Sequence, residues 1–147
     1  MSDEEQVLAD RVVSAMMEKD AFSQWLGISV VRVSPRAVSA TLTVRDDMVN
    51  GFGVCHGGVT FSLADSALAF ASNTHGRVTV SIENSITYPK SIAVGDVLTA
   101  VAEEESATNR LAFYRVTVTR ATEVVALFRG TVYKTNQEFF PQTAQTA

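Results

Sequence analysis

The chain has 147 residues, of which 46% are hydrophobic and 19% are charged. This length fits one domain, and the apolar fraction provides for a core and argues against disorder. The formal net charge is −4 and the basic residues are scattered, which argues against a nucleic-acid or membrane partner. No apolar run approaches the ~20 residues that span a bilayer, and the acidic start MSDEEQVLAD resembles no signal or transit peptide. We therefore expect a soluble, cytoplasmic protein.

The chain offers little for metal or cysteine chemistry. Its one cysteine, Cys55, excludes an intrachain disulfide. Cys55 and His56 are adjacent and His75 stands alone, so no pair has the spacing of a helical or finger-type metal site, and we expect no metal. A Cys55 nucleophile paired with His56 is disfavoured, because adjacent side chains rarely point at each other and no third orienting group is evident.

The predicted elements begin with a helix over residues 3–19. Ser2 and Glu5 have the spacing of a capping box, and apolar residues then recur at helical intervals. From Gly27 the period changes to two, so residues 28–33 and 38–44 are predicted to form a hairpin. The polar and glycine-rich stretch 46–58 is predicted to be a loop.

A second helix is predicted over residues 57–72, where the chain is apolar nearly all round and the side chains are mostly small. Such a helix is normally buried, and small side chains let a sheet wrap closely around it. Four more alternating stretches follow, over residues 78–88, 97–104, 111–119 and 124–133. The polar tail, 135–147, is expected to be partly disordered.

Together these elements predict an α+β fold: an antiparallel sheet of about six strands around one long central helix, with a short N-terminal helix, in a single domain of residues 1–147. A lone helix covers only part of the apolar face of such a sheet. We therefore also expect an oligomer that buries the remainder.

Asp65 is the only ionisable residue within residues 61–70, and it lies too far into the predicted helix to be a cap. An unpaired buried carboxylate is unfavourable, so something must offset its charge or use it. The carboxylate is either satisfied by nearby hydroxyls, such as those of Ser62 or Ser66, or serves as a functional acid. We favour the functional acid.

Gly57 and Gly58 stand where this helix is predicted to begin. The first N–H groups of a helix lack intrahelical partners and carry the positive end of its dipole. Two residues without Cβ leave these groups accessible to a ligand oxygen, which makes the pair a candidate oxyanion hole; a plain loop-to-helix turn is the alternative.

Gly57 and Asp65 are eight residues apart, which is about 12 Å along a continuous helix. One carbonyl group therefore cannot lie within ~3 Å of both. If both act on one substrate they come from different subunits, and a symmetric dimer has two such sites.

Other polar residues are weaker candidates. Asn50 in the loop is suited to orient a water or a carbonyl group, and His56 to cap the helix; for each, a structural role in the loop is the alternative. Ser81, on the polar face of its strand, is a candidate to hold a water. Three further residues could contact the phosphates of a nucleotide-bearing substrate: Lys90, Asn109 and Arg110. The alternative is that they are ordinary solvated side chains.

The run NGFGVCHGG over residues 50–58, followed by FSLAD over residues 61–65, resembles the hot-dog thioesterases of the phenylacetyl-CoA thioesterase (PaaI) family. ITY over residues 86–88 and GDVLTA over residues 95–100 are supporting matches, and the resemblance covers about residues 22–134. It implies a hot-dog fold and hydrolysis of an acyl-CoA thioester, with an aryl-acetyl-CoA such as phenylacetyl-CoA or hydroxyphenylacetyl-CoA as substrate and no separate cofactor.

The resemblance also implies roles for single residues. Asp65 is implied as the general base for water, or as the nucleophile of a mixed anhydride, and the Gly57 N–H of the other subunit as the group that polarises the thioester carbonyl. Asn50 and Ser81 fall where relatives position the carbonyl or the water, and His56 is expected to support the loop. Gly58 is expected to contact the substrate.

The expected assembly is a homodimer with a continuous sheet, or a homotetramer built as a dimer of dimers. One departure concerns the stretch after the third strand of the family, where relatives often carry Arg-Pro. This chain has Pro89-Lys90-Ser91, so Lys90 is the candidate replacement for the arginine.

Three other functions stay open. A medium- or long-chain acyl-CoA thioesterase would use the same motif, which does not define the acyl pocket. A hot-dog hydratase or dehydratase is the second. Enzymes of that kind commonly carry a histidine five residues after the aspartate, and Phe70 at that position of this chain counts against this function. A non-catalytic acyl-CoA-binding protein is the third; regulators of that kind carry a DNA-binding domain, whereas one short helix is predicted before this sheet.

Overall fold

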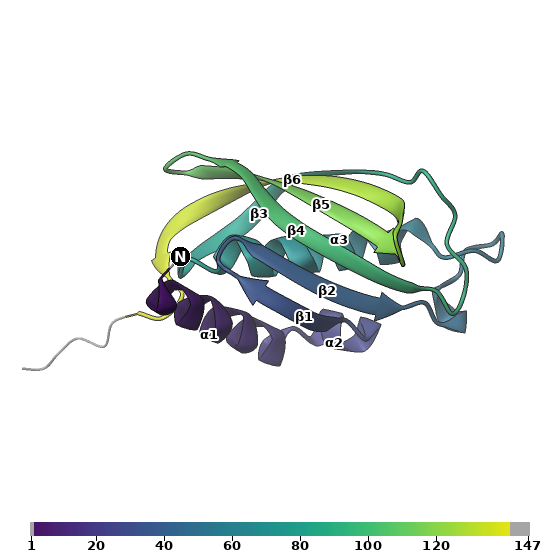
Figure 1. The fold of residues 1–147 in the computed structure, drawn as a ribbon, viewed down its shortest axis with the longest axis horizontal. Helices are drawn as coiled ribbons and strands as arrows, with labels where there is room; N and C mark the ends of the chain where they lie inside the picture. The colour runs from purple at the N-terminus through teal and green to yellow at the C-terminus, as the bar shows by residue number, and fades with distance from the viewer. Residues whose placement is uncertain (1, 142–147) are drawn as a thin grey trace, which may run out of the picture.

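The computed structural model describes residues 2–141, in which six antiparallel strands curve around one long helix (Figure 1). Its elements, in chain order, are α1 (Asp3–Lys19), α2 (Ala21–Leu26), β1 (Ser29–Ser34), β2 (Ala37–Thr43), a 3₁₀ turn (Asp46–Met48), α3 (Gly57–Asn73), β3 (Arg77–Thr87), β4 (Val97–Ala107), β5 (Leu111–Arg120) and β6 (Glu123–Glu138). The predicted sheet, central helix and N-terminal helix are confirmed.

The strands lie in the order β1-β2-β4-β5-β6-β3, so β1 and β3 are the two edges of the sheet. The alternation seen in the sequence corresponds to one face that packs on α3 and one that does not; in β2, for example, Val38, Ala40 and Leu42 are buried. In β3 the register against β6 shifts between Ser81 and Glu83, which is a β-bulge.

Helix α3 is the centre of the core. Leu63, Leu68 and Phe70 are fully buried, and burying each such side chain contributes about 1.5–3 kcal/mol. Ala64, Ala67 and Ala71 are also fully buried, and they let the strands approach the helix closely. The small residues of this helix therefore act as predicted.

Helix α1 begins with the predicted capping box: the Ser2 hydroxyl accepts from the Glu5 N–H at 3.2 Å, and the Glu5 carboxylate accepts from the Ser2 N–H at 3.0 Å. The helix lies beside β1 and α3 (Figure 1). Its Ala9, Val12 and Val13 are buried. None of the helices within residues 2–141 is long and apolar enough to cross a membrane.

Two expectations are wrong. Two helices, α1 and α2, precede the sheet instead of one; α2 is capped by the Asp20 carboxylate and ends at Gly27, whose φ is +80°. The polar tail does not begin at 135, because residues 135–138 continue β6 and Glu138 pairs with Arg77 of β3. Residues 142–147 of the expected tail lie outside the described part of the chain.

Candidate active site

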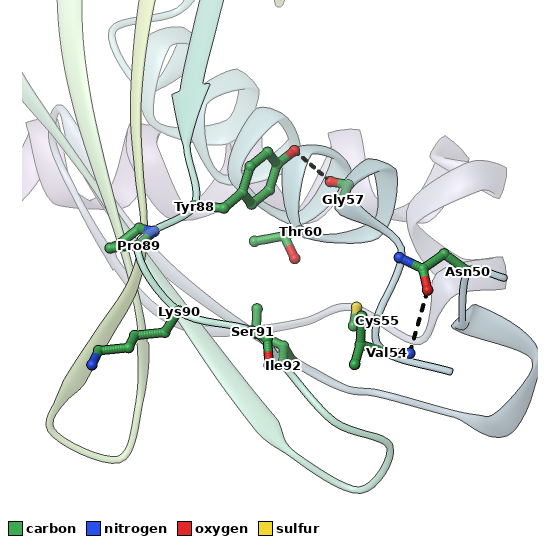
Figure 2. Close-up of a pocket in the computed structure, with 10 residues that line it drawn as sticks. All are labelled: Asn50, Val54, Cys55, Gly57, Thr60, Tyr88, Pro89, Lys90, Ser91 and Ile92. Atoms are coloured by element: carbon green, nitrogen blue, oxygen red, sulfur yellow. Dashed lines mark hydrogen bonds between the residues drawn. The ribbon is translucent and has the colours of Figure 1, made fainter. Parts of the chain in front are cut away.

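The first turn of α3 is tied down from both sides. His56 is its N-cap, and the His56 Nδ1 atom accepts from the Gly58 N–H at 2.9 Å. The Tyr88 hydroxyl, after β3, donates to the Gly57 carbonyl at 2.7 Å (Figure 2). Within residues 2–141 the Gly57 N–H has no hydrogen-bond acceptor. Of the two N–H groups predicted to be open, only the Gly57 N–H is open, because the Gly58 N–H is hydrogen-bonded to His56.

Both glycines leave room for a neighbouring side chain. A Cβ atom on Gly57 would lie 3.0 Å from the Tyr88 hydroxyl oxygen, and one on Gly58 would lie 2.9 Å from His56 Nδ1. Either atom would push away the side chain that shapes this turn. The double glycine thus serves local packing as well as access to the N–H.

A pocket of about 320 Å³ opens beside this turn. It is lined by Asn50, Val54, Cys55, Gly57, Thr60, Tyr88, Pro89, Lys90, Ser91 and Ile92 (Figure 2). Three predicted site residues meet here, namely Asn50, Gly57 and Lys90. The Asn50 side-chain oxygen accepts from the Phe52 N–H at 2.9 Å, which holds the loop, while its NH₂ group stays available as a donor.

Cys55 is unsuited to act as a nucleophile. Burial raises the pKa of its thiol, so little thiolate forms at neutral pH. The His56 Nδ1 atom is engaged with the Gly58 N–H instead of the sulfur. This agrees with the expectation that Cys55 and His56 do not form a catalytic pair.

Asp65 is half-buried on α3, and its partner is a residue that the sequence did not point to. The Asn84 side-chain NH₂ donates to Asp65 Oδ1 at 3.2 Å. Burial raises the pKa of the Asp65 carboxyl, and the Asn84 hydrogen bond partly opposes this because it favours the ionised form. Asn84 is two residues before Ile86, so strand alternation places its amide on the same inward face of the strand, and this is the signal in the sequence that could have identified it.

The alternative in which local hydroxyls satisfy Asp65 is wrong. The Ser62 hydroxyl donates to the Gly58 carbonyl at 2.7 Å, and the Ser66 hydroxyl lies 2.8 Å from that of Ser23. Neither is available to the carboxylate. Asp65 is held from across the helix–strand contact instead of from its own helix.

The predicted separation of Gly57 and Asp65 holds. Helix α3 is continuous from Gly57 to Asn73, so about 12 Å separates the two residues along its axis. The pocket at Gly57 accordingly does not include Asp65. Within this chain the candidate oxyanion donor and the candidate acid occupy two separate places.

The remaining predicted residues are dispersed. Ser81 donates from its hydroxyl to Asn84 Oδ1 at 2.8 Å, so it belongs to the surroundings of Asp65. Arg110 donates to the Asn136 side-chain oxygen at 2.6 Å, and Asn109 lies beside it in the β4–β5 turn. This turn packs near the start of β3, whereas Lys90 follows its end; the 11 residues of β3 span roughly 36 Å. This chain by itself does not bring Lys90 together with Asn109 and Arg110.

No group of three His, Cys, Asp or Glu side chains within the described residues is arranged to hold a metal ion. The polar groups at the two places are the Gly57 N–H and the Asn50 amide at one, and the Asn84 amide and the half-buried Asp65 carboxylate at the other. Such a set can polarise a carbonyl group and accept a proton from water.

Comparisons with known proteins agree with this chemistry. The sequence model of the Thioesterase superfamily matches residues 52–127. Acyl-coenzyme A thioesterase PaaI of Escherichia coli K12 is 38% identical over 117 residues, which cover 79% of this chain and 84% of that protein. The structure of the E. coli PaaI protein, from the phenylacetic acid degradation operon, superposes with a TM-score of 0.88 at 33% identity and covers 90% of this chain and 97% of that one.

A Streptococcus mutans UA159 protein solved with bound acetyl CoA is 28% identical with a TM-score of 0.72, covering 76% of this chain and 90% of that one. The chain thus belongs to the thioesterase superfamily and has its hot-dog fold. Within that class it is an acyl-CoA thioesterase similar to PaaI, as the motif at residues 50–65 indicated.

Proposed function

We propose that this enzyme hydrolyses an aryl-acetyl-CoA, such as phenylacetyl-CoA or hydroxyphenylacetyl-CoA, to the free acid and CoA, with Asp65 of one subunit and the Gly57 N–H of its partner acting on one substrate. The observation that carries the proposal is the half-buried Asp65 carboxylate, eight residues along a continuous helix from an N–H group without an acceptor in the described chain. A raised pKa suits a carboxylate that must accept a proton.

In the general-base route, Asp65 accepts a proton from water while the water oxygen bonds to the thioester carbon. The carbonyl oxygen gains the negative charge and accepts from the Gly57 N–H. When the intermediate collapses, the carbon–sulfur bond breaks and the CoA thiolate takes the proton that Asp65 accepted, which regenerates the carboxylate. In the nucleophilic route, an Asp65 oxygen bonds to that carbon, CoA thiolate leaves, and water then cleaves the mixed anhydride.

The two-subunit site requires a dimer, and the free edge of the sheet supports one. Strand β3 is an edge strand, and Val80 and Ile82 on it are 48% and 57% exposed. A long apolar edge with unpaired backbone groups favours pairing with another strand. Pairing with the β3 edge of a second copy would continue the sheet and place the two α3 helices near each other. We propose this dimer, or a homotetramer made of two such dimers, as the active form.

The substrate class draws on the relatives. The E. coli protein stems from the phenylacetic acid degradation operon, and the S. mutans protein binds acetyl CoA. Lys90 lines the pocket at Gly57 and its amine extends outward (Figure 2), which suits contact with a CoA phosphate. Asn50 would donate from its NH₂ group to the carbonyl oxygen or to the water. Asn109 and Arg110 would contact the phosphate of a CoA that is bound at the pocket of another subunit.

Medium- and long-chain acyl-CoAs are the alternative substrates. The cytoplasmic location stays a prediction.

The test combines one variant with one substrate screen. Asp65→Asn should lower kcat by about 10²- to 10⁴-fold, the usual contribution of a positioned base, while the oligomer stays intact by size-exclusion chromatography. Near-wild-type turnover would contradict the assignment. For the wild type, kcat/KM should be highest on aryl-acetyl-CoAs among aryl-, short- and long-chain substrates; a preference for long chains would replace the proposed substrate and leave the site assignment in place.

A further inference from the structure

Three side chains form one hydrogen-bonded line beneath β3. The Ser81 hydroxyl donates to Asn84 Oδ1 at 2.8 Å, and the Asn84 NH₂ group donates to Asp65 Oδ1 at 3.2 Å. Ser81 and Asn84 belong to the edge strand, and Asp65 belongs to α3. The line therefore joins the candidate acid to the sheet and not to its own helix.

The direction of the Asn84 amide follows from this line. A carboxylate only accepts, so the amide must turn its NH₂ group toward Asp65. The Ser81 hydroxyl, which can donate or accept, then donates to the amide oxygen on the other side. The carboxylate thus selects which end of Asn84 it meets, and Ser81 holds the other end of the amide in place.

A backbone feature makes room for the amide. Asn84 is paired with Gly130 of β6, and Gly130 is buried. A Cβ atom at position 130 would lie 2.7 Å from Asn84 Oδ1 and 2.5 Å from Leu68 Cδ2. No real Cβ atom is found so close to other heavy atoms, so the observed position of Asn84 depends on glycine at this point of the neighbouring strand.

We infer that Asn84 is a positioning residue for thioester hydrolysis: it holds Asp65 through Oδ1, with its own amide oxygen hydrogen-bonded by Ser81, and leaves Oδ2 for the water or the substrate carbon. Among the described residues, none donates a hydrogen bond to Asp65 Oδ2. The inference rests on the proposed role of Asp65. A carboxylate fixed in one rotamer presents its free oxygen in a constant direction, which is what a positioned base or nucleophile requires.

The same contact affects protonation. A hydrogen bond donated to a carboxylate favours its ionised form, so loss of the donor raises the pKa of the acid. The ionised fraction of Asp65 would then be smaller at any given pH below neutrality. The acid limb of the pH–rate profile, where the rate falls as Asp65 becomes protonated, must therefore move to higher pH when Asn84 is changed.

The experiment measures kcat and KM against pH from about 4 to 9 for wild type, Asn84→Ala, Asn84→Asp and Ser81→Ala, with phenylacetyl-CoA as substrate. For Asn84→Ala we expect kcat to fall about 10-fold with little change in KM, and the acid limb to rise by about one pH unit. Asn84→Asp is nearly isosteric and places a like charge beside the acid, so its limb should rise further. Ser81→Ala should shift the limb in the same direction by less.

Ser85→Ala is the matched control, because Ser85 is exposed on the same strand and its side chain has no hydrogen bond to another described residue. Its profile should match that of wild type. Unshifted acid limbs in Asn84→Ala and Asn84→Asp, with both proteins folded by circular dichroism, would overturn the inference. If Asn84→Ala does not fold, the acid limb of the pH–rate profile of Asn84→Asp is sufficient to support or overturn the inference.

The outcome separates this inference from the proposed function. An inactive Asp65→Asn together with unshifted Asn84 variants contradicts the positioning role alone. An active Asp65→Asn contradicts the proposed function, and the positioning role with it.

Discussion

The Tyr88 hydroxyl donates a 2.7 Å hydrogen bond to the Gly57 carbonyl oxygen and so joins the end of β3 to the first turn of α3. The same two residues are in close steric contact, since a Cβ atom on Gly57 would lie 3.0 Å from that hydroxyl. Tyr88 thereby holds the Gly57–Gly58 peptide, which follows directly after the open N–H of Gly57. A strand-end tyrosine thus restrains the helix start that carries the proposed oxyanion donor.

Tyr88→Phe should therefore reduce activity more than stability. We expect kcat/KM to fall about 10-fold, equivalent to ~1.4 kcal/mol of transition-state stabilisation, because the first turn of α3, which carries the Gly57 N–H, loses an anchor. The free energy of unfolding should drop by about 0.5–1.5 kcal/mol, the usual net contribution of one hydrogen bond. Steady-state kinetics and urea denaturation measure the two effects.

Tyr133→Phe serves as the control for that change. Tyr133 is similarly exposed, and its hydroxyl makes no hydrogen bond to the part of the chain that the structure describes. Equal losses of activity in both variants would contradict a specific role for Tyr88.

The two-subunit site predicts complementation. Asp65→Ala and Gly57→Val protomers should each be inactive alone. In a heterodimer, the intact Asp65 of one protomer meets the intact Gly57 of the other, so one of two sites works. Refolding an equal mixture should restore about a quarter of wild-type activity, since about half of the dimers are mixed. Heterodimers that are confirmed by native mass spectrometry but inactive would rule out a shared site.

Gly130→Ala should destabilise the protein and impair Asp65 together. The added Cβ would approach Leu68 and Asn84 within 2.7 Å, and overpacking of this kind costs about 1–3 kcal/mol. Gly51→Ala is the control, because a Cβ at Gly51 would meet nothing within 4 Å; its free energy of unfolding should change by less than about 0.5 kcal/mol. Thermal unfolding at a fixed protein concentration compares the two. Equal melting temperatures would show that the strand accommodates the methyl group.

His75 predicts a pH dependence of stability. Burial, with the nearby charges of Lys134 and Arg77, lowers the pKa of His75 to about 4 from an ordinary 6.5. Below pH 6.5 the unfolded chain binds a proton that the folded chain does not, so stability falls as the pH drops from 6.5 to 4. His75→Gln should remove about 1–3 kcal/mol of that decline. Denaturant titrations at pH 7.5 and 4.5 measure it; an identical decline in both proteins would contradict the assignment.

The fold was predictable where the pattern is local. A stretch that is apolar nearly all round identified α3, helical spacing identified α1, and the period of two identified the strands. Helix α2 was missed because it has only six residues, and its start depends on the Asp20 cap. Residues 135–138 were misassigned because they are polar, and only their pairing with the distant start of β3 makes them a strand.

The site was predictable in its parts along the chain but not across it. Asp65 stood out because its charge interrupts an apolar helix, and the distance to Gly57 followed from helix geometry. Asn84 was not found, because its contact with Asp65 joins residues 19 positions apart in a helix and a strand. The hydrogen bond from the Gly58 N–H to His56, which leaves that N–H unavailable to a ligand, depends on the orientation of the imidazole ring, and a sequence does not specify this orientation.

The bulge in β3 has a consequence for how this strand tolerates change in length. In a regular strand, residues three apart point to opposite faces, and Ser81 would point away from Asn84. The extra residue between Ser81 and Glu83 restores them to one side, opposite Val132 and Gly130 of β6. Deleting Ile82 would therefore remove the bulge and leave Ser81 and Asn84 two positions apart in a regular strand, still opposite Val132 and Gly130, so the link to Asp65 tolerates the loss of this residue.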